Sequence, residues 1–103
     1  MIKATVLYPN EEGKHFDLNY YTEKHMPMVK RLLGEACRKA EVEKGISGAA
    51  PGSAPANTVI GYLYFDTVEA LQNSFGQNAE EIVGDVKNFT NINPVMQISE
   101  IIL

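Results

Sequence analysis

The sequence lacks the features that mark several large classes of protein. Its 103 residues contain a single cysteine, Cys37, so the chain cannot form an internal disulfide, and this is typical of a reducing compartment. We expect this thiol to be inert or half-buried. No hydrophobic run is long enough to span a membrane, and residues 2–8 alternate in polarity instead of forming the apolar part of a signal peptide. These features predict a cytoplasmic protein without a membrane partner.

Positive charge is also scarce. The chain has 9 lysines and arginines against 13 acidic residues, and the net charge of −4 argues against nucleic acid as a partner. Glycine-rich phosphate-binding motifs and the G-x-S-x-G motif of many hydrolases are absent. The two histidines, His15 and His25, do not form a metal-binding motif with the acidic residues near them. We therefore expect no metal and no cofactor.

The hydrophobic pattern instead predicts one small α+β domain that spans residues 1–103. Hydrophobic residues make up 45% of the chain, which is a normal proportion for a globular protein. The expected elements are, in order, a strand at 2–8, a helix at 16–34, a weak edge strand at 39–44, a strand at 58–65, a helix that starts from a capping box at 66–69 and breaks near Gly76, and a strand at 95–103. This β-α-β-β-α-β order predicts a ferredoxin-like fold, with a four-stranded antiparallel sheet and helices on one face.

The strand at 58–65 is apolar on both of its faces. Tyr62 and Tyr64 point one way, and Leu63 and Phe65 point the other way. Two helices cover only one face of a sheet, so the other face would expose apolar side chains to water. Pairing two such faces about a two-fold axis would bury them, and we therefore expect a homodimer.

The helix expected at 16–34 carries most of the chemical groups. Residues that recur at steps of three and four share its inward-facing side: Leu18, Tyr21, His25, Met28, Val29 and Leu32. Asp17 can cap the first turn, and Gly34 can end the last. Pro27 removes a backbone hydrogen bond, so the helix should kink or break beside His25 and leave a space beneath it. The alternative is that Pro27 only starts a second helical segment.

Three short runs follow the first strand in a specific order. They are the pair Tyr20-Tyr21, the run His25-Met26-Pro27-Met28 and the run Leu32-Leu33-Gly34. In these runs, and in the order of elements over nearly the whole chain, the sequence resembles the EthD family of the dimeric α/β-barrel superfamily. The resemblance implies a small dimeric protein with a buried pocket, associated with the oxidation or degradation of apolar compounds.

His25 is the candidate catalytic residue. A histidine on an apolar helix face is more often a satisfied core residue, and it is the resemblance that favours a catalytic role. A neutral imidazole can accept a proton from an acidic C–H or O–H, so His25 would act as a general base. Tyr21, one turn earlier, would hydrogen-bond a carbonyl or phenolate oxygen of the substrate. The residues expected to bind the substrate around them are Tyr20, Pro27, Tyr62, Tyr64 and Phe75.

Two hypotheses on function follow. In the first, the protein is a cofactor-independent, monooxygenase-like oxidoreductase that acts on a small apolar or aromatic compound between the first helix and the sheet. Because related barrels also isomerise lactones, an isomerase on the same fold stays an alternative. In the second, the protein is a non-catalytic binding module, since no acid–base partner lies beside His25 in the sequence. The connector at 45–57 is either a lid over the pocket or simply mobile.

Overall fold

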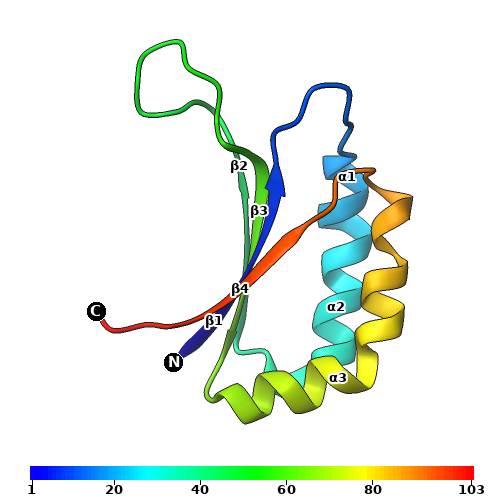
Figure 1. Cartoon of the computed structure of the whole chain (residues 1–103). Helices are drawn as coiled ribbons and strands as arrows, with labels where there is room; N and C mark the ends of the chain where they lie inside the picture. The colour runs from blue at the N-terminus through cyan, green and yellow to red at the C-terminus, as the bar shows by residue number, and fades with distance from the viewer.

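A four-stranded antiparallel sheet forms one layer of the protein, in a computed structural model that describes residues 1–103. Its strands are β1 (Ile2–Pro9), β2 (Lys39–Lys44), β3 (Asn57–Phe65) and β4 (Val95–Glu100). They lie in the order β2-β3-β1-β4, so β1 and β3 are central and the weak strand β2 is at an edge, as the sequence predicts (Figure 1).

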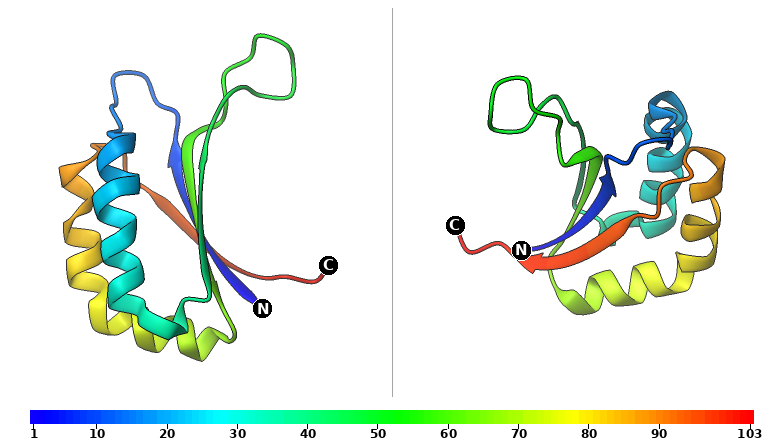
Figure 2. Two further views of the ribbon diagram at one scale, coloured as in Figure 1. Left: turned by 180° about the vertical axis from the view of Figure 1, so that it is seen from behind. Right: turned by 45° about the horizontal axis from the view of Figure 1, so that its top comes forward.

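The helices form a second layer on one face of this sheet (Figures 1 and 2). The helical segments are α1 (Leu18–Tyr20), a π-helical turn (Tyr21–His25), α2 (Met26–Leu33), a 3-10 turn (Gly34–Ala36), α3 (Val68–Gly84) and a second 3-10 turn (Val86–Asn88). The predicted ferredoxin-like fold is therefore confirmed. None of the helices is long and apolar enough to cross a membrane.

The first helical segment changes its hydrogen-bond pattern at Pro27 instead of breaking. The Asp17 side chain accepts a hydrogen bond from the Tyr20 backbone at 3.1 Å, and Gly34 ends the segment with a φ of 61°. Before the proline, the Met26 N–H donates to the carbonyl of Tyr21 in a π-helical turn. Pro27 then lies in the first turn of α2, where a missing N–H costs nothing. The alternative interpretation of Pro27 is the correct one.

The predicted break near Gly76 is wrong, because α3 continues through this residue from Val68 to Gly84. The helix bends instead, and its second half runs beside α2 (Figure 1). Within α3, Ser74 donates its hydroxyl to the carbonyl of Ala70 at 2.6 Å, an interaction that often bends helices. The two halves of α3 therefore run in different directions without a loop between them (Figure 1).

The start of α3 also differs from the expected capping box. Thr67, not Asp66, is the N-cap, and its hydroxyl accepts a hydrogen bond from the Ala70 backbone at 3.0 Å. Asp66 instead pairs with Arg38 at 2.9 Å, just before β2. Both carboxylate and hydroxyl side chains suit an N-cap, so the choice depends on a tertiary contact that the local sequence does not contain.

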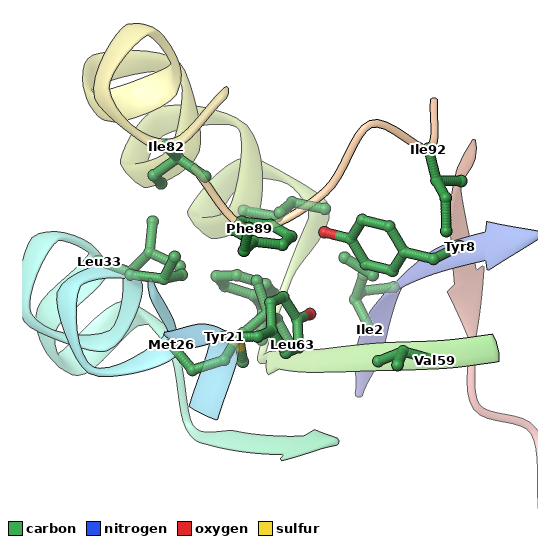
Figure 3. Close-up of a cluster of buried hydrophobic side chains, with 14 residues drawn as sticks. Ile2, Tyr8, Tyr21, Met26, Leu33, Val59, Leu63, Ile82, Phe89 and Ile92 are labelled. Carbon is green, nitrogen blue, oxygen red and sulfur yellow. The ribbon is translucent and has the colours of Figure 1, made fainter. Parts of the chain in front are cut away.

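The core lies between the sheet and the helices, where 14 hydrophobic side chains are buried (Figure 3). On β3, Val59, Leu63 and Phe65 point into it. The opposite face of the sheet is open, and it is more mixed in character than the apolar residues of β3 alone suggest. Its side chains are polar, charged and apolar, and they include Lys3, Thr5, Leu7, Glu41, Glu43, Ile60, Tyr62 and Tyr64.

The connector between β2 and β3 projects beyond the end of the sheet, away from the helices (Figure 1). It is held at its base by the hydrogen bond from the Gly45 backbone to Thr58 at 2.8 Å, and Ile46 is almost fully exposed. Its position bears on the lid hypothesis, because a lid must reach the mouth of a pocket.

Candidate functional site

A cavity of about 270 Å³ lies between the helices and the covered face of the sheet. Of the 14 residues that line it, 11 are hydrophobic. The only one that can take up a positive charge near neutral pH is His25. The 14 residues are Val6, Tyr8, Tyr21, His25, Met26, Val29, Gly61, Leu63, Phe75, Ile82, Val83, Val86, Pro94 and Met96. The cavity opens to solvent between α3 and β4, because Val83 and Met96 line it and are 60% and 43% exposed.

The structure brings together three of the residues singled out from the sequence. Tyr21, His25 and Phe75 line the cavity, although their sequence positions belong to two different helices. Nothing from the connector at 45–57 lines it, so this connector is not a lid of the cavity within one chain.

The other four candidates, Tyr20, Pro27, Tyr62 and Tyr64, do not line this cavity. Tyr62 and Tyr64 are on the open face of the sheet, because the helices cover the alternate residues of β3. Pro27 is exposed and borders a shallow depression between α2 and β2. Tyr20 does not line the cavity but contacts the side chain that holds His25.

His25 is buried at the end of the π-helical turn, with only 4% of its surface exposed. Its Nδ1 lies 2.9 Å from Oδ2 of Asp85, which follows α3 directly. The ring stacks on Tyr21 with centroids 5.4 Å apart, and the Phe89 ring lies at 4.6 Å. Nε2 of His25 makes no hydrogen bond within the chain. Every fully buried side-chain nitrogen in the protein has a partner, so Nε2 is not fully buried. Because His25 lines the cavity, we infer that Nε2 is open to it.

Asp85 is the acid–base partner that we did not expect from the sequence. Besides His25, it accepts hydrogen bonds from the Tyr20 hydroxyl at 2.7 Å and from the Asn88 amide at 2.8 Å. Partial burial raises the pKa of this carboxyl, but the hydrogen bonds from Asn88, His25 and Tyr20 together lower the pKa below its usual value. Asp85 is therefore ionised at neutral pH, and it gives His25 the acidic partner that does not lie beside it in the sequence.

One local signal does mark Asp85. A negative charge at the C-terminal end of a helix faces the negative end of the helix dipole, which is unfavourable. An acidic residue in such a position indicates that another interaction holds it there. Sixty residues separate Asp85 from His25, so the sequence alone does not identify the partner.

His25 is neutral at pH 7. Burial lowers the pKa of its imidazole below 6.5, and the hydrogen bond and charge of Asp85 only partly oppose this effect. Because the Asp85 carboxylate can only accept, the proton of the neutral ring is on Nδ1. Nε2 therefore presents a lone pair to the cavity, as a general base or a hydrogen-bond acceptor requires.

Two buried tyrosines supply the other polar atoms of the cavity. Burial raises the pKa of Tyr21 to about 12, against the smaller opposite effect of the Tyr8 hydroxyl, and burial also raises the pKa of Tyr8. Both hydroxyls therefore stay protonated at neutral pH. The Tyr21 hydroxyl packs against Gly61 of β3, where a Cβ atom would overlap it. The glycine in this otherwise bulky strand thus makes the space in which Tyr21 fits.

Other candidate groups do not assemble into a site. No cluster of three or more His, Cys, Asp or Glu side chains lies in a position to hold a metal ion. Cys37 is half-buried, its thiol donates to the Lys39 carbonyl at 3.4 Å, and burial raises its pKa. The thiol is accordingly protonated at neutral pH and a poor nucleophile.

Solved structures similar to this chain share its fold. A crystal structure of an EthD-like protein from Ralstonia eutropha JMP134 is 44% identical, with a TM-score of 0.95 over 99% of this chain and 92% of that one. An EthD family protein from Bacillus halodurans C-125 is 19% identical, with a TM-score of 0.68 over 99% of both chains. A monooxygenase from Streptomyces coelicolor in complex with nanaomycin D is 14% identical, with a TM-score of 0.60 over 99% of this chain and 90% of that one. The last two show the fold alone.

Sequence families give a consistent result. No curated protein matches the chain. The model of the EthD domain matches residues 13–93, which include the helical segments, the cavity residues on β3 and the Asp85 partner of His25. The resemblance seen in the sequence is thereby confirmed, and the chain belongs to the EthD family.

Proposed function

We propose that the protein is an enzyme that binds a small apolar or aromatic compound in this cavity and oxidises or degrades it without a bound cofactor, with molecular oxygen as the co-substrate that accepts the electrons in the oxidation. The observation that carries the proposal is the environment of His25. One ring nitrogen is held by an ionised carboxylate, while the other has no partner and is open to an apolar cavity. A neutral imidazole held in this way is suited to remove a proton from a bound substrate.

The neighbouring residues have separate roles in this proposal. Asp85 keeps the proton on Nδ1 and stabilises the imidazolium that forms when Nε2 takes up a proton. Tyr20 positions Asp85 through its hydrogen bond at 2.7 Å. The neutral Tyr21 hydroxyl donates to the oxygen on which negative charge develops, and Phe75 forms part of the apolar wall.

One protein of the same fold is consistent with an oxidation of a small organic compound. The Streptomyces coelicolor protein with this fold is a monooxygenase, and it was crystallised in complex with nanaomycin D. A lactone-type isomerase on the same fold is the alternative reaction, because the same base would remove and return a proton without any redox step. A non-catalytic binding module is the alternative to an enzyme.

We also propose that the protein pairs into a homodimer through the open face of the sheet. This face carries both signs of charge, for example Lys3 and Glu41, as well as Val95, which is 54% exposed. Opposite charges and apolar residues on one surface can complement a second copy about a two-fold axis. Sedimentation velocity at micromolar concentration should show a dimer, and Val95→Glu should shift it towards monomer without unfolding. A folded wild-type monomer would contradict the proposal.

Substitution of His25 tests the proposed catalysis. Aromatic compounds recovered from the purified protein should be identified and used as substrates. His25→Gln should lower kcat by about 10²–10⁴-fold, the usual contribution of a positioned base, with little change in affinity. The matched control is His15→Gln, because the hydrogen bonds of His15 involve only its backbone atoms. The activity of this variant should equal that of the wild type.

The same assay separates the alternatives. Turnover of the His25→Gln variant at the wild-type rate would end the general-base proposal. No turnover by either protein, together with tight binding by both, would favour the binding module. Product of unchanged oxidation state would favour the isomerase.

A further inference from the structure

We propose that the natural ligand is a neutral phenol or enol of one or two rings, whose O–H group donates a hydrogen bond to Nε2 of His25. The inference rests on the proposed function, because it uses His25 as the base, and it narrows the ligand from apolar compounds in general to weak O–H acids. The proposal excludes three classes of ligand: pure hydrocarbons, ethers and compounds that carry a carboxylate.

The need for a donor on the ligand follows from the hydrogen bonds of Asp85. This carboxylate accepts from Tyr20, Asn88 and His25, so the proton of the neutral ring stays on Nδ1. Nε2 is then an acceptor without a partner inside a largely apolar cavity. A ligand without a donor would displace water from Nε2 without replacing its hydrogen bond. Leaving a desolvated acceptor without a partner costs binding free energy.

The need for a neutral ligand follows from the charges around the cavity. No lysine or arginine is among the residues that line it. A carboxylate would lose its hydration there without gaining an opposite charge, and it would approach the negative charge of Asp85. A fixed anion is therefore excluded by the same features that favour a neutral O–H.

A charge created inside the cavity is a different case. When the ligand reacts, its O–H bond breaks and an Nε2–H bond forms, so the complex keeps the same net charge. The product is an anion next to an imidazolium, and the imidazolium is paired on its other side with Asp85 at 2.9 Å. The neutral Tyr21 hydroxyl is available to donate to the ligand oxygen. The site is thus built to make a phenolate or enolate in place.

The size of the cavity limits the rest of the ligand. About 270 Å³ is slightly below the roughly 300–1,000 Å³ range of pockets for drug-sized ligands, which indicates one or two rings. The aromatic side chains of Tyr21 and Phe75 offer edges and faces for an aromatic ligand to pack on.

Four probes of nearly the same shape test the inference: naphthalene, 2-methoxynaphthalene, 2-naphthol and 2-naphthoate. Isothermal titration calorimetry with the wild-type protein at pH 7 should give 2-naphthol an affinity at least about tenfold higher than 2-methoxynaphthalene, which corresponds to about 1.4 kcal/mol. Naphthalene should bind like 2-methoxynaphthalene, and 2-naphthoate should bind most weakly.

The dependence of these affinities on pH is a second readout that needs no variant. The ionisable groups that contact the His25 ring are Asp85 and Tyr21, and Tyr20 contacts Asp85. At a pH below the pKa of His25, the protonated ring cannot accept, so the affinity for 2-naphthol should fall to that of naphthalene. The affinity for naphthalene should change little over the same range.

The outcomes that contradict the inference are distinct from those that contradict the proposed function. Equal affinities for naphthalene, 2-methoxynaphthalene and 2-naphthol would disprove the O–H class but leave an apolar binding site in place. Tightest binding of 2-naphthoate would disprove the neutral-ligand argument. If none of the four binds up to its solubility limit, both the inference and the proposed aromatic ligand are wrong.

Discussion

Tyr21 and Tyr62 lie on opposite faces of the same sheet, and the pKa of each hydroxyl is raised to about 12. Burial is the main cause for Tyr21, whose hydroxyl packs against Gly61 on the covered face. The main cause for Tyr62 is the hydrogen bond that it donates to Glu43 at 2.7 Å on the open face. Equal pKa values thus arise from different surroundings.

The comparison extends to the groups around each tyrosine. On the open face, Lys3 lies 4.8 Å from the centre of the Tyr62 ring, and the Tyr64 hydroxyl donates to Glu41 at 2.6 Å. The carboxylates of Glu41 and Glu43 are exposed to water, which competes for these interactions and makes each one worth little. On the covered face, the side chains of Asp85 and His25 are only 14% and 5% exposed, and His25 lines the cavity.

This difference separates a surface network from a candidate site. Both regions contain tyrosine hydroxyls bonded to carboxylates, so the residue types alone do not distinguish them. What distinguishes them is that the covered network leaves one nitrogen of His25 without a partner at a largely apolar cavity. A perturbed pKa indicates function only when such a geometry accompanies it.

The largest effect is expected from filling the space under Tyr21. Gly61→Ala places a Cβ atom against the Tyr21 hydroxyl and should destabilise the protein by about 1–3 kcal/mol, the usual cost of overpacking. Gly76→Ala is the matched control, because nothing lies within 4 Å of the added atom, and removing a helical glycine should stabilise α3 by about 0.5–1 kcal/mol. Urea unfolding measures both changes. Equal signs for the two variants would contradict this account of Gly61.

A smaller effect is expected from removing the charge of Asp85. Asp85 raises the pKa of His25 against the larger effect of burial, so Asp85→Asn should lower this pKa further. NMR titration of the His25 imidazole measures the change, and Glu43→Gln on the open face is the control that should leave it unaltered. An unchanged His25 pKa in Asp85→Asn would show that burial alone determines it.

The same variant changes the dependence of stability on pH. Between about pH 6.5 and the lower pKa of folded His25, the unfolded chain binds a proton that the folded chain does not. The free energy of unfolding of the wild type should therefore fall as pH drops below about 6.5. In Asp85→Asn this range should extend to lower pH, and in His25→Gln the contribution should be absent.

The smallest effect is expected on the open face. Glu43→Gln removes the carboxylate that raises the pKa of Tyr62, so this pKa should move down towards 10, while that of Tyr21 stays at about 12. Stability should change by no more than about 0.5 kcal/mol, as for most surface substitutions. NMR of ¹³C-labelled tyrosine at high pH follows each ring separately. A fall in the pKa of Tyr21 would mean that the two faces are coupled.

Much of the fold could be predicted because its causes are local. Alternating residues in 2–8 and 58–65 predict the two central strands, and the repeats of three and four after Asp17 predict the first helix with its cap. The periodicity of β3 also divides its residues correctly into two sets. It does not say which set the helices cover, because both are apolar. Only the tertiary structure shows that Tyr62 and Tyr64 lie on the side that the helices leave open.

The candidate site could be predicted only in part. The position of His25 and Tyr21 on the inner side of the first helix follows from helical spacing, as does their approach to the same cavity. The π-helical turn between them does not, because it depends on how the chain before Pro27 packs against its neighbours. The continuation of α3 through Gly76 likewise depends on packing beside α2, which offsets the cost of a glycine inside a helix.

By itself, then, the sequence determined the order of elements, the family and the helix that carries the base, since spacing along the chain sets which residues share a face. Only the tertiary structure decided what that base can do. It places Asp85, 60 residues away, on one nitrogen of His25 and leaves an apolar cavity at the other. The pKa and the hydrogen bonds of His25 depend on residues that are close in space, and these residues cannot be identified from their spacing along the chain.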